Sequence, residues 1–156
     1  MSPINKWAPP TWILFHTLAF KLKESEYKTL GPVLFNFITQ VCHNLPCPTC
    51  AEHAKTYINS RLMKDTSFMT NKKLFINALY IFHNDVNERI KKPMFNYEDL
   101  LKMYQGKSLI HVYNNFVQNF HSGGTLTLIN QNFHKKRILN AFKAWILANI
   151  KSFGIL

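Results

Sequence analysis

Glycine and acidic side chains are scarce in this sequence. Only 5 of the 156 residues are glycine, whereas 47% are hydrophobic and 13 are phenylalanine. A disordered chain would contain far less apolar material, so we expect a compact, mostly helical domain with a sizeable core. Eight acidic residues are outnumbered by 19 basic ones, which gives a net charge of +11. This charge would suit an anionic partner, but the lysines occur in ones and twos, so we expect no nucleic-acid partner.

Long apolar runs are also absent. Residues 1–7 contain no signal-peptide core, and no uninterrupted apolar segment reaches membrane-spanning length. We therefore expect an intracellular protein without a signal peptide or transmembrane segment. Three cysteines argue against a structural disulfide framework and, in this setting, indicate redox or metal chemistry.

Two of the cysteines lie close together in the sequence Leu-Pro-Cys-Pro-Thr-Cys-Ala-Glu-His at 45–53. Cys47 and Cys50 could close a small disulfide that is easily reduced, or they could supply half of a zinc site together with His53. The proline after Cys47 favours a helix start there, where the helix dipole stabilises a thiolate. We expect Cys47 to be the more exposed cysteine and Cys50 the more buried one.

Apolar periodicity predicts five helices in the first two thirds of the chain. Proline and glycine are expected to mark several of their ends, with Gly31 and Pro32 separating the first two helices and Asn71 capping the fourth. The first predicted helix opens within residues 7–12, with Pro10 at an early helical position, and runs to about residue 22. The other predicted helices cover approximately residues 33–44, 48–62, 72–90 and 97–105, and the segment 64–70 is expected to be a polar loop.

The C-terminal third gives a weaker pattern. Residues 108–120 fit either a helix or a strand, and a turn is expected at 121–124. The alternation at 125–129 predicts a short strand. Residues 137–153 have the pattern of an amphipathic basic helix.

Three polar motifs fall on successive predicted helices: Trp12-x-x-x-His16, Cys47-x-x-Cys50-x-x-His53 and His83-Asn84-x-Val86-Asn87. Together they resemble the Erv/ALR family of FAD-linked sulfhydryl oxidases, and in particular its small viral members, over about residues 7–105. The resemblance implies an all-α fold: a four-helix bundle plus a short fifth helix that binds FAD. It places residues 1–105 in the oxidase domain and leaves 106–156 as a C-terminal extension of uncertain structure, packed on the same domain.

The resemblance also implies a role for each motif. The flavin would lie against Cys50, the adenine and ribose would be held by the His83 motif, and basic residues would suit the pyrophosphate. The implied catalytic residues are Cys47 and Cys50. The implied FAD contacts are Trp12, His16, Cys50, His53, His83, Asn84, Asn87, Arg89 and Lys92, with no metal ion.

The chemistry implied by the resemblance is thiol oxidation. A substrate thiolate attacks the Cys47–Cys50 disulfide at Cys47, a second thiol releases the oxidised product, and the electrons pass to FAD and then to O2, which yields H2O2. Cys42 is expected to be a buried bystander. The chain lacks the shuttle cysteine pair of many members, so the dithiol of a partner protein, either thioredoxin-like or from a virion, is expected to reach Cys47 directly.

Other expectations follow from the resemblance. Tyr80 and Tyr97 occupy the positions at which many cellular members carry a structural disulfide. A homodimer formed through the first helices is implied and, for a viral protein, a location in the host cytoplasm or the virion.

Three alternatives remain open on the sequence alone. A zinc-stabilised helical binding module could use His43, Cys47, Cys50 and His53, although wrapping all four around one ion across a helix start is awkward. A thioredoxin-like reductase is less favoured because the cysteine pair does not follow a strand of a βαβ unit. The third alternative is a basic nucleic-acid-binding protein with incidental cysteines.

Overall fold

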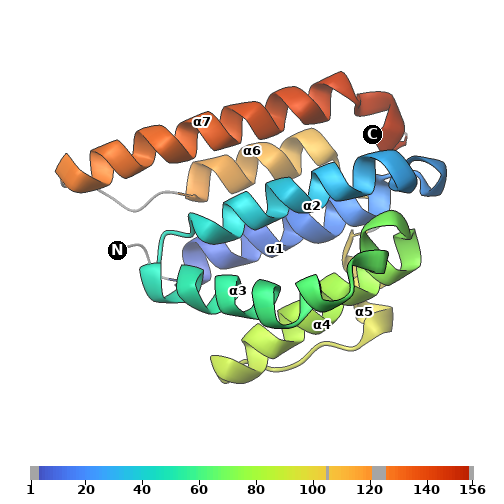
Figure 1. Ribbon diagram of the computed structural model, residues 1–156, viewed down its shortest axis with the longest axis horizontal. Coiled ribbons are helices and arrows are strands. Elements are labelled where there is room, and N and C mark those ends of the chain that lie inside the picture. The colour runs from blue at the N-terminus through green and yellow to red at the C-terminus, as the bar shows by residue number, and fades with distance from the viewer. Residues whose placement is uncertain (1–3, 105, 121–125, 155–156) are drawn as a thin grey trace.

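The computed structural model describes residues 4–104, 106–120 and 126–154, and the regular structure in these ranges is entirely helical (Figure 1). This confirms the predicted all-α fold. Short 3₁₀ turns lie at 24–26, 62–64, 66–70 and 150–153. The α-helices are α1 (Ile4–Lys21), α2 (Tyr27–His43), α3 (Pro48–Ser60), α4 (Lys72–Arg89), α5 (Tyr97–Tyr104), α6 (Leu109–Asn119) and α7 (Leu126–Ala148).

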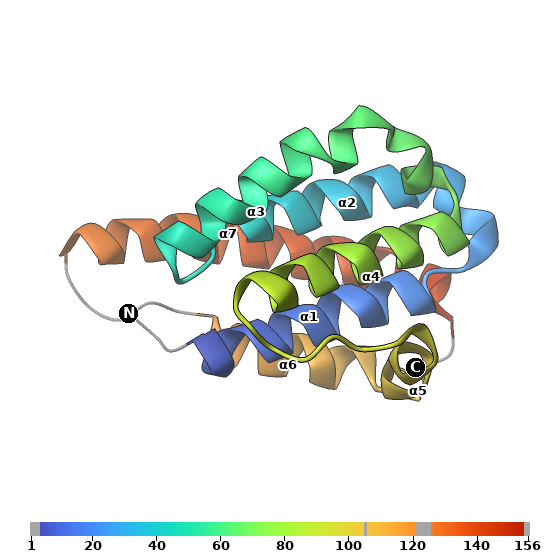
Figure 2. The same cartoon turned by 90° about the horizontal axis from the view of Figure 1, so that it is seen from below.

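Helices α1 to α4 form a four-helix bundle. In Figure 2, α1 lies beside α4 and α2 lies beside α3, and both pairs are in contact. Helix α5 contacts α1 at the end of the bundle opposite the start of α3. Each bundle helix buries an apolar stripe in the centre, which includes the fully buried residues Leu14, Leu18, Leu34, Ile38 and Phe75.

Helix α1 begins earlier than the sequence pattern predicts. It starts at Ile4, so Pro9 and Pro10 lie inside it, and the prediction that Pro10 marks an early helical position is wrong. A proline has a helical φ, but it lacks the N–H that would bond to the carbonyl four residues earlier, and its ring crowds that carbonyl. For Pro9 and Pro10 the affected carbonyl groups lie in the first turn of α1. The hydroxyl of Thr11 donates to the Trp7 carbonyl oxygen at 2.7 Å and adds a bond to this part of the helix.

Helix α2 also begins earlier than predicted, at Tyr27, and continues through Gly31 and Pro32. The prediction that these two residues separate the helices is therefore wrong. Gly31 is required by a close approach: a Cβ atom at this position would overlap the backbone carbonyl oxygen of Met69. The missing side chain lets the 3₁₀ turn at 66–70 pack directly on α2.

The structure decides between the helix and the strand that the sequence pattern allowed in the C-terminal third. Residues 109–119 are helical, and α7 begins at Leu126, so the predicted strand is wrong for 126–129; residue 125 and the predicted turn at 121–124 lie outside the described residues. A five-residue alternation is too short to outweigh the longer helical pattern that follows it. The helix predicted for 137–153 ends at Ala148 and is followed by the 3₁₀ turn.

Helices α6 and α7 cover one face of the bundle. Helix α6 lies along α1 and α7 lies along α2 (Figure 1). The contact with α2 includes Phe37 and Phe142, whose rings stack with 4.7 Å between centroids, and Trp145, whose ring lies 5.5 Å from that of Phe37. In the described part of the chain, no helix is long and apolar enough to cross a membrane.

Candidate active site

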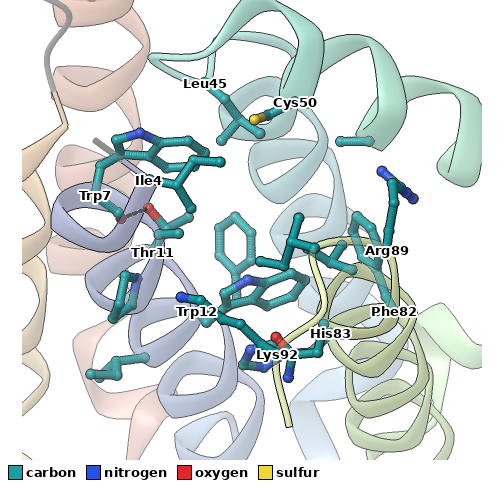
Figure 3. Close-up of a pocket in the computed structure, with 18 of the residues that line it drawn as sticks. Ile4, Trp7, Thr11, Trp12, Leu45, Cys50, Phe82, His83, Arg89 and Lys92 are labelled. Carbon is teal, nitrogen blue, oxygen red and sulfur yellow. Dashed lines mark hydrogen bonds between the residues drawn. The ribbon is translucent and has the colours of Figure 1, made fainter. Parts of the chain in front are cut away.

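A cavity of about 300 Å³ opens between α1, α3, α4 and the segment that follows α4 (Figure 3). Cys50 lies on the α3 side of the cavity, and Trp12 and His83 lie across from it. Much of the wall is apolar, with Leu45, Ala54, Phe82, Val86, Ile90 and Phe95 among the lining residues. Seven of the residues expected to bind FAD line this one cavity: Trp12, Cys50, His53, His83, Asn87, Arg89 and Lys92.

Cys47 and Cys50 form a disulfide at the start of α3, with their Cα atoms 5.2 Å apart. Cys47 is the N-cap of the helix, and its sulfur accepts a hydrogen bond from the Cys50 backbone N–H at 3.2 Å. The predicted helix start after Cys47 is therefore confirmed. The N-terminal end of the α3 dipole and this N–H both stabilise negative charge on the Cys47 sulfur.

The expected difference in exposure between these cysteines is wrong. Cys47 is 9% exposed, whereas Cys50 is half-buried and lines the cavity. The capping position turns the Cys47 sulfur back over the first turn of α3, and Cys50, one turn later, faces the cavity. The two sulfurs therefore still have different surroundings.

A stack of aromatic rings forms the wall opposite Cys50. The rings of Trp12 and His83 are nearly parallel, with 4.1 Å between their centroids and 4° between their planes. Phe82 packs edge-on against Trp12 at 5.2 Å, and Phe95 packs edge-on against His83 at 4.4 Å. Trp12 thus has a neighbour on each of two sides, which holds its flat indole at the cavity wall.

His16 lies below this wall and does not line the cavity. It is 1% exposed, and its Nε2 atom lies 2.9 Å from Nδ1 of His83. No partner for its Nδ1 atom is found among the described residues. Burial lowers the pKa of His16 well below its usual value, and the neighbouring His83 lowers it further. His16 is therefore neutral at physiological pH.

His83 is neutral as well, because burial and the charge of Lys92 lower its pKa to about 3. A hydrogen bond between two neutral imidazoles has one donor. If His83 donated, the buried Nδ1 of His16 would carry an N–H without a partner, which is rarer in proteins than an unsatisfied acceptor. We therefore assign Nε2 of His16 as the donor, so that His83 carries its proton on Nε2.

The two asparagines of the third motif face different surroundings. Asn87 is 6% exposed and lines the cavity. Asn84 does not line it: its Oδ1 accepts from the Phe95 N–H at 3.1 Å, and its Nδ2 donates to the Phe95 carbonyl oxygen at 3.0 Å. The Tyr80 hydroxyl donates to the same oxygen at 2.9 Å, and the Tyr80 ring packs edge-on against Tyr97 at 5.5 Å. Asn84 and Tyr80 thus fasten the segment after α4 to the helix.

Two cations lie at the cavity edge near the end of α4. Arg89 pairs with Asp85 at 2.9 Å on the exposed side of the helix. The chain leaves α4 through Lys91, which has φ of 59°, and the Lys92 N–H then donates to the Asn87 carbonyl oxygen at 2.8 Å. This is the bonding pattern of a Schellman helix end, and it turns Lys92 towards the cavity.

The sequence pattern missed several wall residues. Phe82, Phe95 and Tyr104 follow an ordinary apolar pattern, so nothing in the sequence separates them from core residues. Cys42 was expected to be a buried bystander. It is 3% exposed and free, and burial raises its pKa to about 12, but it also lines the cavity.

The zinc alternative is not favoured. Cys47 and Cys50 are bonded to each other. Within residues 4–104, 106–120 and 126–154, no three histidine, cysteine, aspartate or glutamate side chains lie close enough together to hold a metal ion.

Comparison with known proteins identifies the family. The sequence model of the Erv1 / Alr family matches residues 9–105. The chain belongs to the Erv1/Alr family. A protein of Invertebrate iridescent virus 6, provisionally named a FAD-linked sulfhydryl oxidase, is 30% identical over 91 residues, which cover 56% of this chain and 82% of that protein. This confirms the resemblance predicted from the three motifs.

Two other relatives extend the comparison. The FAD-linked sulfhydryl oxidase of African swine fever virus is 28% identical over 104 residues, covering 64% of this chain and 80% of that protein. The mitochondrial FAD-linked sulfhydryl oxidase of Schizosaccharomyces pombe is 26% identical over 86 residues, covering 55% of this chain and 46% of that protein. No solved structure gives a significant match.

The cavity fits FAD in three respects. The flat indole of Trp12 suits a planar ring system, Arg89 and Lys92 suit an anionic pyrophosphate, and Cys50 places a redox sulfur across the cavity from Trp12. These features come from three different helices and the segment after α4, and only the fold brings them together.

Proposed function

We propose that this chain uses the Cys47–Cys50 disulfide to oxidise dithiols of protein substrates, with FAD bound in the cavity between α1, α3 and α4. Membership of the Erv1/Alr family makes it a flavin-dependent thiol oxidase. The single observation that carries the assignment of residues is that the disulfide lies at the wall of the aromatic cavity, with Cys50 facing into it.

The first half of the reaction is thiol–disulfide exchange. A substrate thiolate attacks the Cys47 sulfur, the bond to Cys50 breaks, and Cys50 leaves as a thiolate. A second substrate thiol then attacks the substrate sulfur of the mixed disulfide and releases Cys47. The substrate has lost two electrons and two protons, and the two cysteines have gained them. Cys47 suits this exchange because a helix N-terminus and the Cys50 N–H stabilise its thiolate.

When bound, FAD supplies the oxygen chemistry: it accepts the electron pair from the reduced cysteines and passes it to O2, which yields H2O2. The protein places and tunes the groups around it. Trp12, His83 and Asn87 would hold the ring systems, Arg89 and Lys92 would neutralise the phosphates, and the exposed His53 would close the edge near Cys50. His16 and Asn84 would act through His83 and through the segment after α4.

The substrate protein and the site of action are also proposals. Because the named relatives include proteins of two viruses, we propose that the chain acts on a thioredoxin-like or virion dithiol in the infected cell or the virion. A homodimer stays a prediction. Helices α6 and α7 cover α1 and α2, so a dimer would need another surface, such as the face of α4 with the exposed Leu74 and Ile81.

Oxygen consumption tests the proposed activity. The purified, FAD-loaded protein should consume O2 and release an equal amount of H2O2 when supplied with dithiothreitol or a reduced dithiol peptide. Cys47→Ser and Cys50→Ser should each abolish turnover, whereas Cys42→Ser should retain it, because the protonated Cys42 thiol is a poor nucleophile. Full turnover by Cys50→Ser would refute the assignment.

A further inference from the structure

The two sulfurs of the redox disulfide are approached from different sides. Cys50 is half-buried and lines the cavity between α1, α3 and α4, beside Leu45 (Figure 3). Cys47 is 9% exposed and is not part of the cavity wall. A thiol that enters the cavity therefore meets Cys50 and not Cys47.

The cavity is open to a small molecule. Pro9, His53 and Met103 line it and are exposed, so it reaches the surface of the molecule. His53 follows Cys50 by about one helical turn, which places part of this opening next to the disulfide. A volume of about 300 Å³ is enough for a thiol of low molecular mass, but a folded protein cannot enter it.

The stability of the leaving group also favours attack at Cys50. In thiol–disulfide exchange one sulfur is attacked and the other leaves as a thiolate, and the more stable thiolate leaves faster. Cys47 is the N-cap of α3, and its sulfur accepts a hydrogen bond from the Cys50 N–H at 3.2 Å. The helix dipole and this bond both stabilise negative charge on Cys47. Cys47 is therefore the better leaving group of the pair.

A ligand that fills the cavity changes the point of attack. FAD bound in this cavity would cover Cys50, which lines it, but would not cover Cys47, which lies outside it. A thiol that approaches the FAD-loaded protein then has Cys47 as its target, and Cys50 becomes the leaving group.

We propose that the empty cavity admits small thiols to Cys50, and that bound FAD closes this route and confines attack to Cys47. FAD would then shield the disulfide from small thiols in addition to accepting electrons, which favours protein thiols as substrates of the loaded enzyme. This inference rests on the proposed function, because it requires FAD to bind in the cavity.

The exchange in the FAD-free chain balances without another reactant. A small thiolate bonds to the Cys50 sulfur, the Cys47–Cys50 bond breaks, and Cys47 leaves as a thiolate. A second small thiolate attacks the small-thiol sulfur of the mixed disulfide and releases the Cys50 thiolate. Two small thiols have then lost two electrons and formed their own disulfide, and the two cysteines have gained these electrons.

Trapping of the first step tests the proposal. Reduced glutathione is the small thiol, and a thioredoxin whose second active-site cysteine is replaced by serine is the protein thiol. Each is mixed without O2 with the FAD-free and the FAD-loaded protein, and the reaction is stopped rapidly with N-ethylmaleimide. Tandem mass spectrometry then identifies both sulfurs, because the attacked cysteine carries the thiol and the cysteine that left carries the maleimide.

In the FAD-free protein, glutathione should be found on Cys50 about ten times as often as on Cys47. In the FAD-loaded protein it should be found on Cys47. The thioredoxin should be found on Cys47 in both forms, because it cannot enter the cavity. Glutathione on the same cysteine in both forms, whether Cys47 or Cys50, would overturn the proposal.

A cavity-filling variant tests the route without FAD. Ala54 lines the cavity, is 5% exposed, and lies four residues after Cys50 on the same face of α3. FAD-free Ala54→Leu should therefore react with glutathione at Cys50 several times more slowly than the wild type. Thr56→Leu, exposed on the same helix, is the matched control and should react at the wild-type rate. Equal rates in the two variants would show that the thiol does not reach Cys50 through the cavity.

Failure of this inference is distinguishable from failure of the proposed function. A wild-type protein that binds no FAD would refute the proposed function. A protein that binds FAD and consumes O2, but is attacked by glutathione at Cys47 with and without FAD, would refute this inference alone.

Discussion

The Nε2 atom of His16 and the Nδ1 atom of His83 lie 2.9 Å apart and join α1 to α4 below the cavity. His83 in turn stacks on Trp12. A residue that does not line the cavity therefore fixes the tautomer and the position of one that does. This relationship makes His16 a positioning residue.

Replacing His16 tests this role. His16→Ala should lower the free energy of unfolding by about 2–4 kcal/mol, because it removes buried volume and leaves Nδ1 of His83 without its donor. It should also raise the Kd for FAD, measured by quenching of flavin fluorescence. His16→Gln, whose amide can still donate, should recover most of the affinity. His111→Ala removes an exposed histidine and serves as the control; equal affinity in His16→Ala and the control would exclude the positioning role.

Stability should fall in acid because both histidines are held neutral. Their folded pKa values lie below the ordinary 6.5, and that of His83 is about 3. The unfolded chain therefore binds more protons as pH drops below 6.5, and stability is lost from there down to the folded pKa values. By pH 5 the loss should be about 2 kcal/mol for His83, and His16 adds to it in the same direction.

Urea unfolding of the FAD-free protein at pH 7 and pH 5 measures this loss. His16→Gln removes one of the two buried histidines and should reduce the difference in stability between the two pH values. An unchanged pH dependence in His16→Gln would show that the His16 ring is not held neutral.

Asn84 should matter through the segment after α4. Asn84→Ala leaves the Phe95 backbone without its two side-chain partners, which should cost about 2 kcal/mol and raise hydrogen exchange at residues 90–96. The FAD Kd should rise as Lys92 loses its fixed position. Asn77→Ala, on the exposed face of the same helix, is the matched control. Unchanged exchange in Asn84→Ala would contradict this account.

Gly31 tests the packing of α2 against the 3₁₀ turn at 66–70. Alanine normally stabilises a helix interior relative to glycine, but here its Cβ would overlap the Met69 carbonyl oxygen, and a backbone cannot move as a flexible side chain does. Gly31→Ala should therefore destabilise the protein by about 3 kcal/mol in thermal or urea unfolding. Thr29→Ala, exposed on the same helix, should be neutral or slightly stabilising. A stabilised Gly31→Ala would show that the close contact is absent.

The sequence predicted the start of a helix correctly where a single local feature, such as a capping residue, determines it. Asn71 caps α4 by accepting from the Leu74 N–H, and Cys47 caps α3, as expected from their positions. The same local reasoning failed at Pro10 and at Gly31 with Pro32. At Gly31, the packing of the Met69 backbone against α2 outweighs the intrinsic tendency of glycine to end a helix.

The sequence predicted which motifs contribute to the candidate site, but not how their side chains are arranged in it. Spacing identified Trp12, Cys50 and His83, which the fold brings to one cavity from three helices. Spacing could not distinguish Asn84 from Asn87, because which of two neighbouring polar residues faces the cavity depends on where Phe95 returns to the helix. The exposure of Cys47 and Cys50 was predicted in the wrong order, since it depends on the capping geometry of Cys47.

The central claim is that electrons from a dithiol reach bound FAD through Cys50. Anaerobic mixing of the FAD-loaded protein with dithiothreitol, followed by the visible absorbance of the flavin, measures this transfer directly. The wild type should bleach and recover its absorbance when air is admitted, while Cys50→Ser should bind FAD and stay oxidised. A wild-type protein that binds no flavin, or a Cys50→Ser variant that bleaches at the wild-type rate, would contradict the account.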